Sequence, residues 1–166
     1  AMAASVDPWY VLHVRPRCEK KMAEYSSRYH LEHFLPLRSE TKIYQRRKVT
    51  VEKPVFPGYV FIVFNPSQRT TVLKSNLIVN ILETEDQARL VHELKQVRQA
   101  LTVDPTLGAC EAFTQGKRVR IKGGSFQGLE GVVAKQHGQT RVLLNVEMIG
   151  QAVALDIEME LLEPAE

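Results

Sequence analysis

The stretch PVFPGYVFIVF, residues 54 to 64, constrains the fold of this chain more than any other segment. Its second half, Tyr59 to Phe64, is an unbroken run of β-branched and aromatic residues, which favours a buried strand. Phe-Pro-Gly at 56–58 precedes that run directly, and the glycine lets the backbone turn sharply into the strand. We therefore expect a tight turn followed by a sheet strand.

The two faces of this strand differ in chemistry. Alternation puts Tyr59 and Phe61 on one face and Val60 and Ile62 on the other. With Phe56 the aromatic side chains form one apolar surface, and soluble monomers seldom leave such a surface bare unless a partner covers it. The sequence thus predicts an exposed aromatic surface; the alternative is that these residues are core.

The first hundred residues alternate between strand and helix patterns. The predicted order is β-α-β-β-β-α-β-α. The strands are predicted at 8–14, 34–44, 49–51, 59–64 and 78–82. One helix is predicted after Pro16 and ends at about residue 30, a second covers 67 to 76, and a last helix begins at a Thr84–Gln87 capping box. A wholly polar segment at 45–48 is predicted as the tip of a hairpin. This pattern is typical of an α+β domain with a mixed sheet flanked by helices.

The pattern changes after residue 102. Residues 103–115 contain Pro and Gly without periodicity, which is typical of a flexible linker. Short β-rich runs then follow at 119–122, 131–135, 141–146 and 152–157. Because closure removes exposed edges, these runs favour a small β-barrel. The predicted domains are residues 8–102 and 116–163.

Charge is unevenly distributed. The net charge of the chain is only +3, but residues 9–54 hold 11 Lys/Arg and 5 Asp/Glu, whereas residues 156–166 hold five acids and no base. The first segment therefore favours a polyanion. No apolar run approaches the ~20 residues of a membrane span, and two distant cysteines match no metal or redox spacing. We expect a cytoplasmic monomer without membrane contact.

Basic side chains gather around the predicted hairpin tip and on the first helix. Arg46, Arg47 and Lys48 lie at the tip, between Lys42 and Lys53. Such a tip can straddle a phosphate backbone. The alternative is that these cations discourage pairing of an edge strand with other chains.

Catalytic signatures do not appear in the sequence. No glycine-rich phosphate loop joins a strand to a helix, and no nucleophile elbow occurs. His30 and His33 have no third ligand at metal spacing. We therefore expect a protein that is not an enzyme and needs no cofactor or metal.

Residues 116–133, GKRVRIKGGSFQGLEGVV, are the most specific motif in the chain. Val119 and Ile121 alternate inward, and Gly124, Gly128 and Gly131 are predicted to turn tightly or to take positive φ. The stretch resembles the KOW motif, a β-hairpin of small SH3-like barrels in transcription and translation factors.

Three motifs in order, Trp9-Tyr10-Val11, Phe56-Pro57-Gly58-Tyr59-Val60 and the KOW-like stretch, resemble NusG-family transcription elongation factors, with an N-terminal NGN domain and a C-terminal KOW domain. The short hairpin between Lys42 and Pro54 is closest in pattern to the RfaH-like specialised paralogues. The resemblance implies antitermination: docking on the clamp helices of RNA polymerase, suppression of pausing and contact with non-template DNA.

The resemblance also assigns residues. It implies polymerase binding by Trp9, Phe56, Pro57, Tyr59, Phe61, Val91, Leu94, Arg69, Thr70 and Thr71, and DNA contact by Arg15, Tyr25 and Arg28. In the KOW-like part, Met148, Ile149 and Gln151 stand where general NusG has an aromatic-Gly-Arg loop that binds Rho and a small-subunit ribosomal protein. Because the aromatic residue and the Arg are replaced, binding of Rho is in doubt, while the ribosomal partner stays open.

Two alternatives remain beside the antiterminating paralogue. One is the housekeeping member of the same family. The other is an RNA-binding, ribosome-associated KOW protein that uses Lys117, Arg118, Arg120 and Lys122. Gly128, Gly131, Gly138 and Gly150 disfavour helix in this part of the chain, so a stable barrel is expected rather than a helical refolded form.

Overall fold

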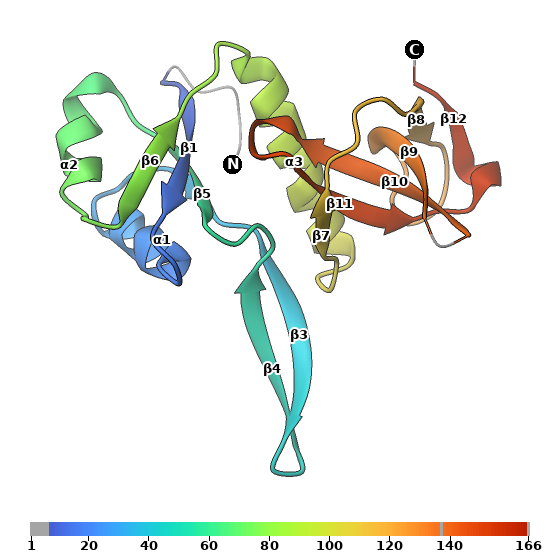
Figure 1. Ribbon diagram of the computed structural model, residues 1–166, viewed down its shortest axis with the longest axis horizontal. Coiled ribbons are helices and arrows are strands. Elements are labelled where there is room, and N and C mark those ends of the chain that lie inside the picture. Colours follow the sequence, from blue (N-terminus) through green and yellow to red (C-terminus); the bar gives the residue numbers. More distant parts are fainter. Residues whose placement is uncertain (1–6, 137, 166) are drawn as a thin grey trace. The chain divides into compact units, whose positions relative to one another are not determined.

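A computed structural model describes residues 7–136 and 138–165 of the protein (Figure 1). The helices and strands are β1 (Trp9–Val14), α1 (Glu19–Arg28), β2 (His33–Phe34), β3 (Leu37–Tyr44), β4 (Arg47–Pro54), β5 (Tyr59–Val63), α2 (Arg69–Leu73), β6 (Ile78–Leu82), α3 (Gln87–Val103), β7 (Ala109–Glu111), β8 (Arg118–Ile121), β9 (Glu130–Gln136), β10 (Gln139–Val146), β11 (Gln151–Asp156) and β12 (Leu162–Pro164), with short 3₁₀ turns η1 (Pro66–Gln68), η2 (Glu147–Ile149) and η3 (Met159–Leu161).

The chain divides into two compact units. The first comprises the residues up to Pro36 together with Phe56–His92, and the second comprises Leu37–Val55 together with the residues from Glu93 onward. Among the described residues, no helix is both long and apolar enough to span a membrane.

The first unit contains a four-stranded sheet in the order β2-β5-β1-β6. All of its pairings are antiparallel, so the predicted mixed sheet is wrong. The crossover through α2 does bring β6 back parallel to β5, but β1 lies between them and runs antiparallel to both. The predicted order of elements is otherwise confirmed, with the two-residue strand β2 added.

The start of α3 differs from the predicted capping box. The Asp86 carboxylate accepts a hydrogen bond from the Arg89 amide at 3.1 Å, so Asp86 caps the helix. The Gln87 side chain instead binds β1, because it accepts from the Trp9 amide at 2.7 Å and donates to the Trp9 carbonyl at 3.0 Å. This fixes the first turn of α3 to the beginning of β1.

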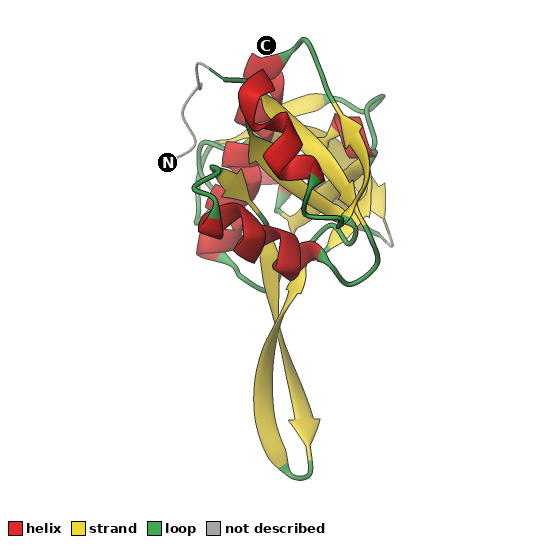
Figure 2. Cartoon of the chain, turned by 90° about the vertical axis from the view of Figure 1, so that its left-hand side faces the viewer, coloured by secondary structure: helices red, strands yellow, loops and turns green. Residues whose placement is uncertain are grey.

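Strands β3 and β4 form a long two-stranded ribbon with eight residue pairs, from Leu37 opposite Pro54 to Tyr44 opposite Arg47 (Figure 2). The turn consists of two residues, Gln45 and Arg46, with φ of 48° and 64°. Two positive φ values in a two-residue loop match the strand twist of a hairpin. The predicted four-residue tip at 45–48 is therefore wrong, since Arg47 already lies in β4.

The second unit contains a six-stranded antiparallel sheet in the order β12-β8-β9-β10-β11-β7. The four strands predicted in residues 116–163 all form. Strand β7 lies inside the predicted linker, where it pairs with β11. Gln96 of α3 hydrogen-bonds the backbone N–H and C=O of Glu130 at 2.8 and 2.7 Å, so the later part of α3 groups with this sheet. Closure into a barrel stays a prediction.

Two kinds of glycine occur in the KOW-like stretch. Gly124 and Gly128 have φ of +85° and +95°, which confirms the predicted left-handed turns. Gly131 lies within β9, where a Cβ would lie 2.4 Å from the carbonyl oxygen of Leu143 and 2.7 Å from a methyl group of Val142. Close approach of β10, rather than positive φ, therefore explains the glycine at 131.

Candidate functional site

The turn that begins β5 has the geometry expected from its sequence. Pro57 and Gly58 are its central residues, the Tyr59 amide donates to the Phe56 carbonyl at 3.2 Å, and Gly58 has φ of +91°. Proline followed by a positive-φ glycine is typical of a type II turn. The Gly58 amide also donates to a carboxylate oxygen of the buried Glu19 at 2.7 Å, which fastens the turn to α1.

The first face of the sheet is the core between the sheet and helices α1 and α2. Its buried residues from the two central strands and the position after β5 pack with three residues outside the sheet. They are Leu12, Val14, Val60, Ile62 and Phe64, together with Met22, Leu31 and Val72. Val60 and Ile62 both belong to this cluster, which confirms the predicted alternation along β5.

The opposite face carries the aromatic residues. In the register of β1 and β5, Trp9 lies opposite Val63, and Val11 lies opposite Phe61. The Phe61 ring has its centroid 6.3 Å from that of Phe34 and 6.5 Å from that of Phe56. We call Trp9, Val11, Phe34, Phe56, Phe61 and Val63 the aromatic face.

The chain buries most of the aromatic face. Trp9, Phe56 and Phe61 are each at most 1% exposed, so the expectation of an exposed surface is wrong for Phe56 and Phe61, and Trp9 follows the alternative of a core residue. Val91 and Leu94 of α3 are buried as well. The reason is that both faces of this sheet are apolar, and burial of both is favourable.

The rim of the aromatic face is accessible. Pro57 is exposed and Tyr59 is half-buried. The Tyr59 ring stacks on His13, with centroids 5.3 Å apart, which holds the ring in one place beside the turn. Of the predicted polymerase-binding aromatic residues, Tyr59 is therefore the one that a partner can reach.

A polar surface joins α1 and α2. Arg69 and Thr70 are exposed and Thr71 is half-buried, and the Tyr25 hydroxyl donates to the Thr71 carbonyl. This hydrogen bond joins Tyr25, which is predicted to contact DNA, to Thr71, which is predicted to bind polymerase. Burial raises the pKa of Tyr25, and nearby Tyr29 raises it further. The Tyr25 hydroxyl is occupied by its hydrogen bond to Thr71. The neighbouring ring of Tyr29, with its centroid 4.6 Å away, is exposed and is therefore the more accessible of the two rings.

The predicted nucleic-acid residues fall into two groups. Arg15, directly after β1, and Arg28, the last residue of α1, are exposed in the first unit. Arg46, Arg47 and Lys48 are exposed on the ribbon, in the second unit. Arg47 and Lys48 are consecutive residues of β4, so their side chains point to opposite faces of the ribbon.

The predicted RNA-binding cations of the second unit are partly neutralised. Arg118 and Arg120 alternate with the buried Val119 and Ile121 along β8. The Arg120 guanidinium lies 2.8 Å from a carboxylate oxygen of Glu130 and 4.0 Å from one of Glu163. Arg120 is thus less available to a phosphate than the alternative hypothesis requires.

The predicted partner loop of the second unit occupies η2 and the start of β11. Met148, Ile149 and Gln151 are half-buried, and Gly150 between them has φ of +65°.

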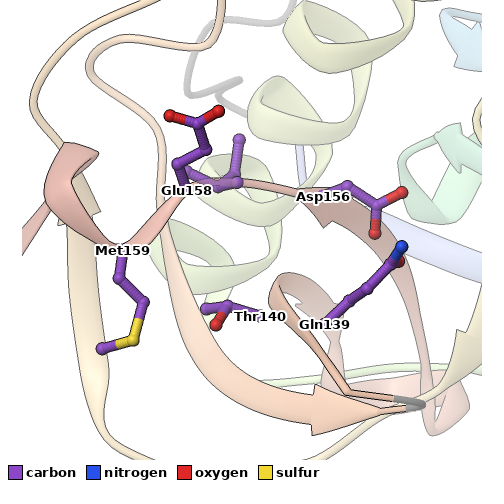
Figure 3. Close-up of a pocket in the computed structure, with 6 residues that line it drawn as sticks. Gln139, Thr140, Asp156, Glu158 and Met159 are labelled. Atoms are coloured by element: carbon purple, nitrogen blue, oxygen red, sulfur yellow. The ribbon is translucent and has the colours of Figure 1, made fainter.

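A shallow depression elsewhere on this sheet is lined by Gln139, Thr140, Asp156, Ile157, Glu158 and Met159 (Figure 3). Asp156 is bound there by Arg141 at 3.1 Å. In the part of the chain that the structure describes, no group of three His, Cys, Asp or Glu residues could hold a metal ion.

Comparison with known proteins connects this geometry with one family. The family model "Transcription termination factor nusG" matches residues 7–101, more than half of the chain. Curated proteins named transcription termination/antitermination protein NusG are similar to it. The one from Borreliella burgdorferi is 23% identical over 145 residues (77% of each chain), the one from Lactococcus lactis 29% over 128 residues (68% of this chain, 64% of the relative), and the one from Rickettsia conorii 22% over 168 residues (92% and 88%).

A solved structure of Thermotoga maritima NusG has the same fold. It covers 99% of this chain with a TM-score of 0.51 at 18% identity, and 100% of its own length is matched. The family match covers all of β1 to β6 and most of α3, which include the aromatic face and the ribbon. The chain therefore belongs to the NusG family of transcription termination/antitermination factors.

Proposed function

We propose that this protein is a transcription elongation and antitermination factor that binds RNA polymerase at the clamp helices and suppresses pausing. The observation that carries this proposal is the second apolar face of the sheet, with Tyr59 and Pro57 accessible at its rim. A core face already packs on α1 and α2, so the aromatic face is not needed to hold those helices. Membership of the NusG family supports a role in transcription.

The arrangement of the rim favours a protein partner. Tyr59 has a large ring with little conformational freedom, and tyrosine is enriched among residues that dominate binding energy. His13 restricts the ring further by stacking on it. Arg69 and Thr70 on α2 would add polar contacts, as the sequence resemblance implies.

The test is capture of core RNA polymerase by the wild-type protein and by Tyr59→Ala. We expect the substitution to weaken binding at least about 30-fold, the effect of losing about 2 kcal/mol at a dominant contact. Tyr44→Ala is the matched control, because Tyr44 is an exposed tyrosine of the ribbon. No capture of polymerase, or equal capture of wild type and Tyr59→Ala, would contradict the proposal.

Within the family, we propose an operon-specific paralogue rather than the housekeeping protein. The short ribbon, with its two-residue turn, is the feature that favours this choice. The housekeeping member fits the family match equally well. Met148, Ile149, Gly150 and Gln151 replace the aromatic-Gly-Arg loop, which also supports a specialised member. Such a member would bind Rho weakly and would keep the ribosomal protein as a partner.

A further inference from the structure

Gly58 is held through the peptide groups on both of its sides. Its N–H donates to a carboxylate oxygen of Glu19 at 2.7 Å, and its C=O accepts from the Val14 N–H at 2.8 Å. The first bond reaches α1 and the second reaches β1. The turn before β5 is therefore attached to two other elements of the first unit at a single residue.

The Pro57–Gly58 peptide is the part of this turn that has two possible orientations. Type I and type II turns differ by a rotation of the central peptide, which gives the residue after it a φ of about −90° or about +80°. Gly58 has φ of +91°, so the central peptide has the type II orientation. Proline is accepted in both types and glycine adopts either sign of φ, so the orientation depends on a contact outside the turn.

Glu19 supplies that contact. The Gly58 N–H belongs to the central peptide, and in the type II orientation it points to the Glu19 carboxylate. In the type I orientation the N–H would point the opposite way, and the bond to Glu19 would be lost. A carboxylate acceptor makes a hydrogen bond about twice as strong as a neutral acceptor does. Glu19 therefore favours the type II form of the turn.

The start of α1 indicates that the Glu19 carboxylate serves the turn rather than its own helix. The N-cap residue is Cys18, whose side chain makes no capping hydrogen bond within the described part of the chain. Glu19 follows as the first helical residue and is only 7% exposed. A buried carboxylate needs hydrogen-bond partners, and this one accepts from a residue 39 positions away.

The turn in turn determines where Tyr59 is presented. The Tyr59 N–H belongs to the same peptide as the Gly58 C=O, which Val14 holds. The Tyr59 ring stacks on His13, its partner in the register of β1 and β5, with 26° between the ring planes. The hydrogen bond within the turn, from Tyr59 to Phe56, is longer at 3.2 Å. Contacts with α1 and β1 therefore fix the turn more firmly than its own bond does.

We propose that Glu19 is a positioning residue for polymerase binding, because it keeps the Pro57–Gly58 peptide in the type II orientation and so holds Pro57 and Tyr59 where the partner contacts them. This deepens the proposed function, on which it rests. Glu19 is itself buried, so it acts on the partner only through the turn.

The binding test is capture of core RNA polymerase by full-length Glu19→Ala, Glu19→Gln and Glu24→Ala. Glu19→Ala removes the acceptor and should weaken binding about 10-fold, whereas Glu19→Gln keeps an accepting oxygen and should bind within about 3-fold of wild type. Glu24→Ala is the matched control, because it removes an exposed carboxylate from the same helix, and it should bind as wild type does. Equal capture of wild type and Glu19→Ala, or an equal loss in Glu19→Gln and Glu19→Ala, would overturn the proposal.

A double-mutant cycle separates positioning from general stabilisation. If Glu19 acts through Tyr59, adding Glu19→Ala to Tyr59→Ala should weaken capture by less than about 3-fold, because the ring that Glu19 positions is already gone. The same loss of about 10-fold with and without the Tyr59 ring is the mark of a merely structural role, and it would rule out positioning.

Hydrogen exchange examines the turn in the free protein. In Glu19→Ala the Gly58 amide should exchange at least about 10-fold faster than in wild type, since its acceptor is lost. The amides that pair β1 with β5 should keep their rates. Equal acceleration of those strand amides would show that the substitution opens the sheet rather than the turn, contrary to the proposal.

Failure here is distinguishable from failure of the proposed function. Polymerase capture that depends on Tyr59 but not on Glu19 would make the positioning role alone wrong. Absence of capture by the wild-type protein would contradict the proposed function, and the positioning role with it.

Discussion

Replacing Phe61 with alanine is expected to lower the free energy of unfolding of the first unit by about 3 to 5 kcal/mol. Phe61 is fully buried in β5, which pairs with β1 on one side and β2 on the other. Its ring neighbours are Phe34 and Phe56, and rigid strands on both sides limit collapse into the cavity.

The loss is measured by urea unfolding with fluorescence of Trp9, the single tryptophan, which is buried on the neighbouring strand. Phe34→Ala is the control, because Phe34 is only half-buried at the edge strand and should cost less than half as much. A decrease below about 1 kcal/mol for Phe61→Ala would show that Phe61 is not part of the core.

Replacing Gly131 with alanine is expected to destabilise the second unit by about 3 kcal/mol, at the upper end for overpacking. The added Cβ would lie 2.4 Å from the Leu143 carbonyl oxygen, a backbone atom of the paired strand β10. Backbone in a ladder cannot shift without loss of hydrogen bonds, so the steric strain is not relieved locally.

Gly128→Ala separates this steric effect from the conformational one. Gly128 has φ of +95°, but nothing lies within 4 Å of a Cβ there, so about 1 kcal/mol is expected. Native-state hydrogen exchange of the β9 and β10 amides measures both variants. Equal destabilisation by the two substitutions would contradict the close approach of β10 at Gly131.

The strands could be predicted because their patterns are local. The run from Tyr59 to Val63 is β-branched and aromatic throughout, and the glycine and proline before it restrict the turn to one geometry. Likewise the short runs after residue 116 are separated by turn residues, so four strands were correctly predicted there. The two-residue β2 and the three-residue β7 and β12 escaped prediction, since their pairing depends on partners distant in sequence.

The surfaces were harder to predict than the elements. Arg46, Arg47 and Lys48 look like one cluster in the sequence, but a two-residue turn places Arg47 and Lys48 in a strand and thus on opposite faces. The Gln-Arg turn has no sequence signal, because Asn-Gly is the usual one. Burial of Phe61 could not be inferred either, since alternation assigns a face and does not say what covers it.

The most direct test of polymerase binding and pause suppression is transcription by RNA polymerase through defined pause sites. Wild-type protein and Tyr59→Ala are compared at equal, saturating concentration. Polymerase binding through the rim of the aromatic face predicts that wild type shortens the pauses and that Tyr59→Ala loses most of this effect. Pauses of unchanged duration with wild type, or shortened equally by Tyr59→Ala, would contradict it.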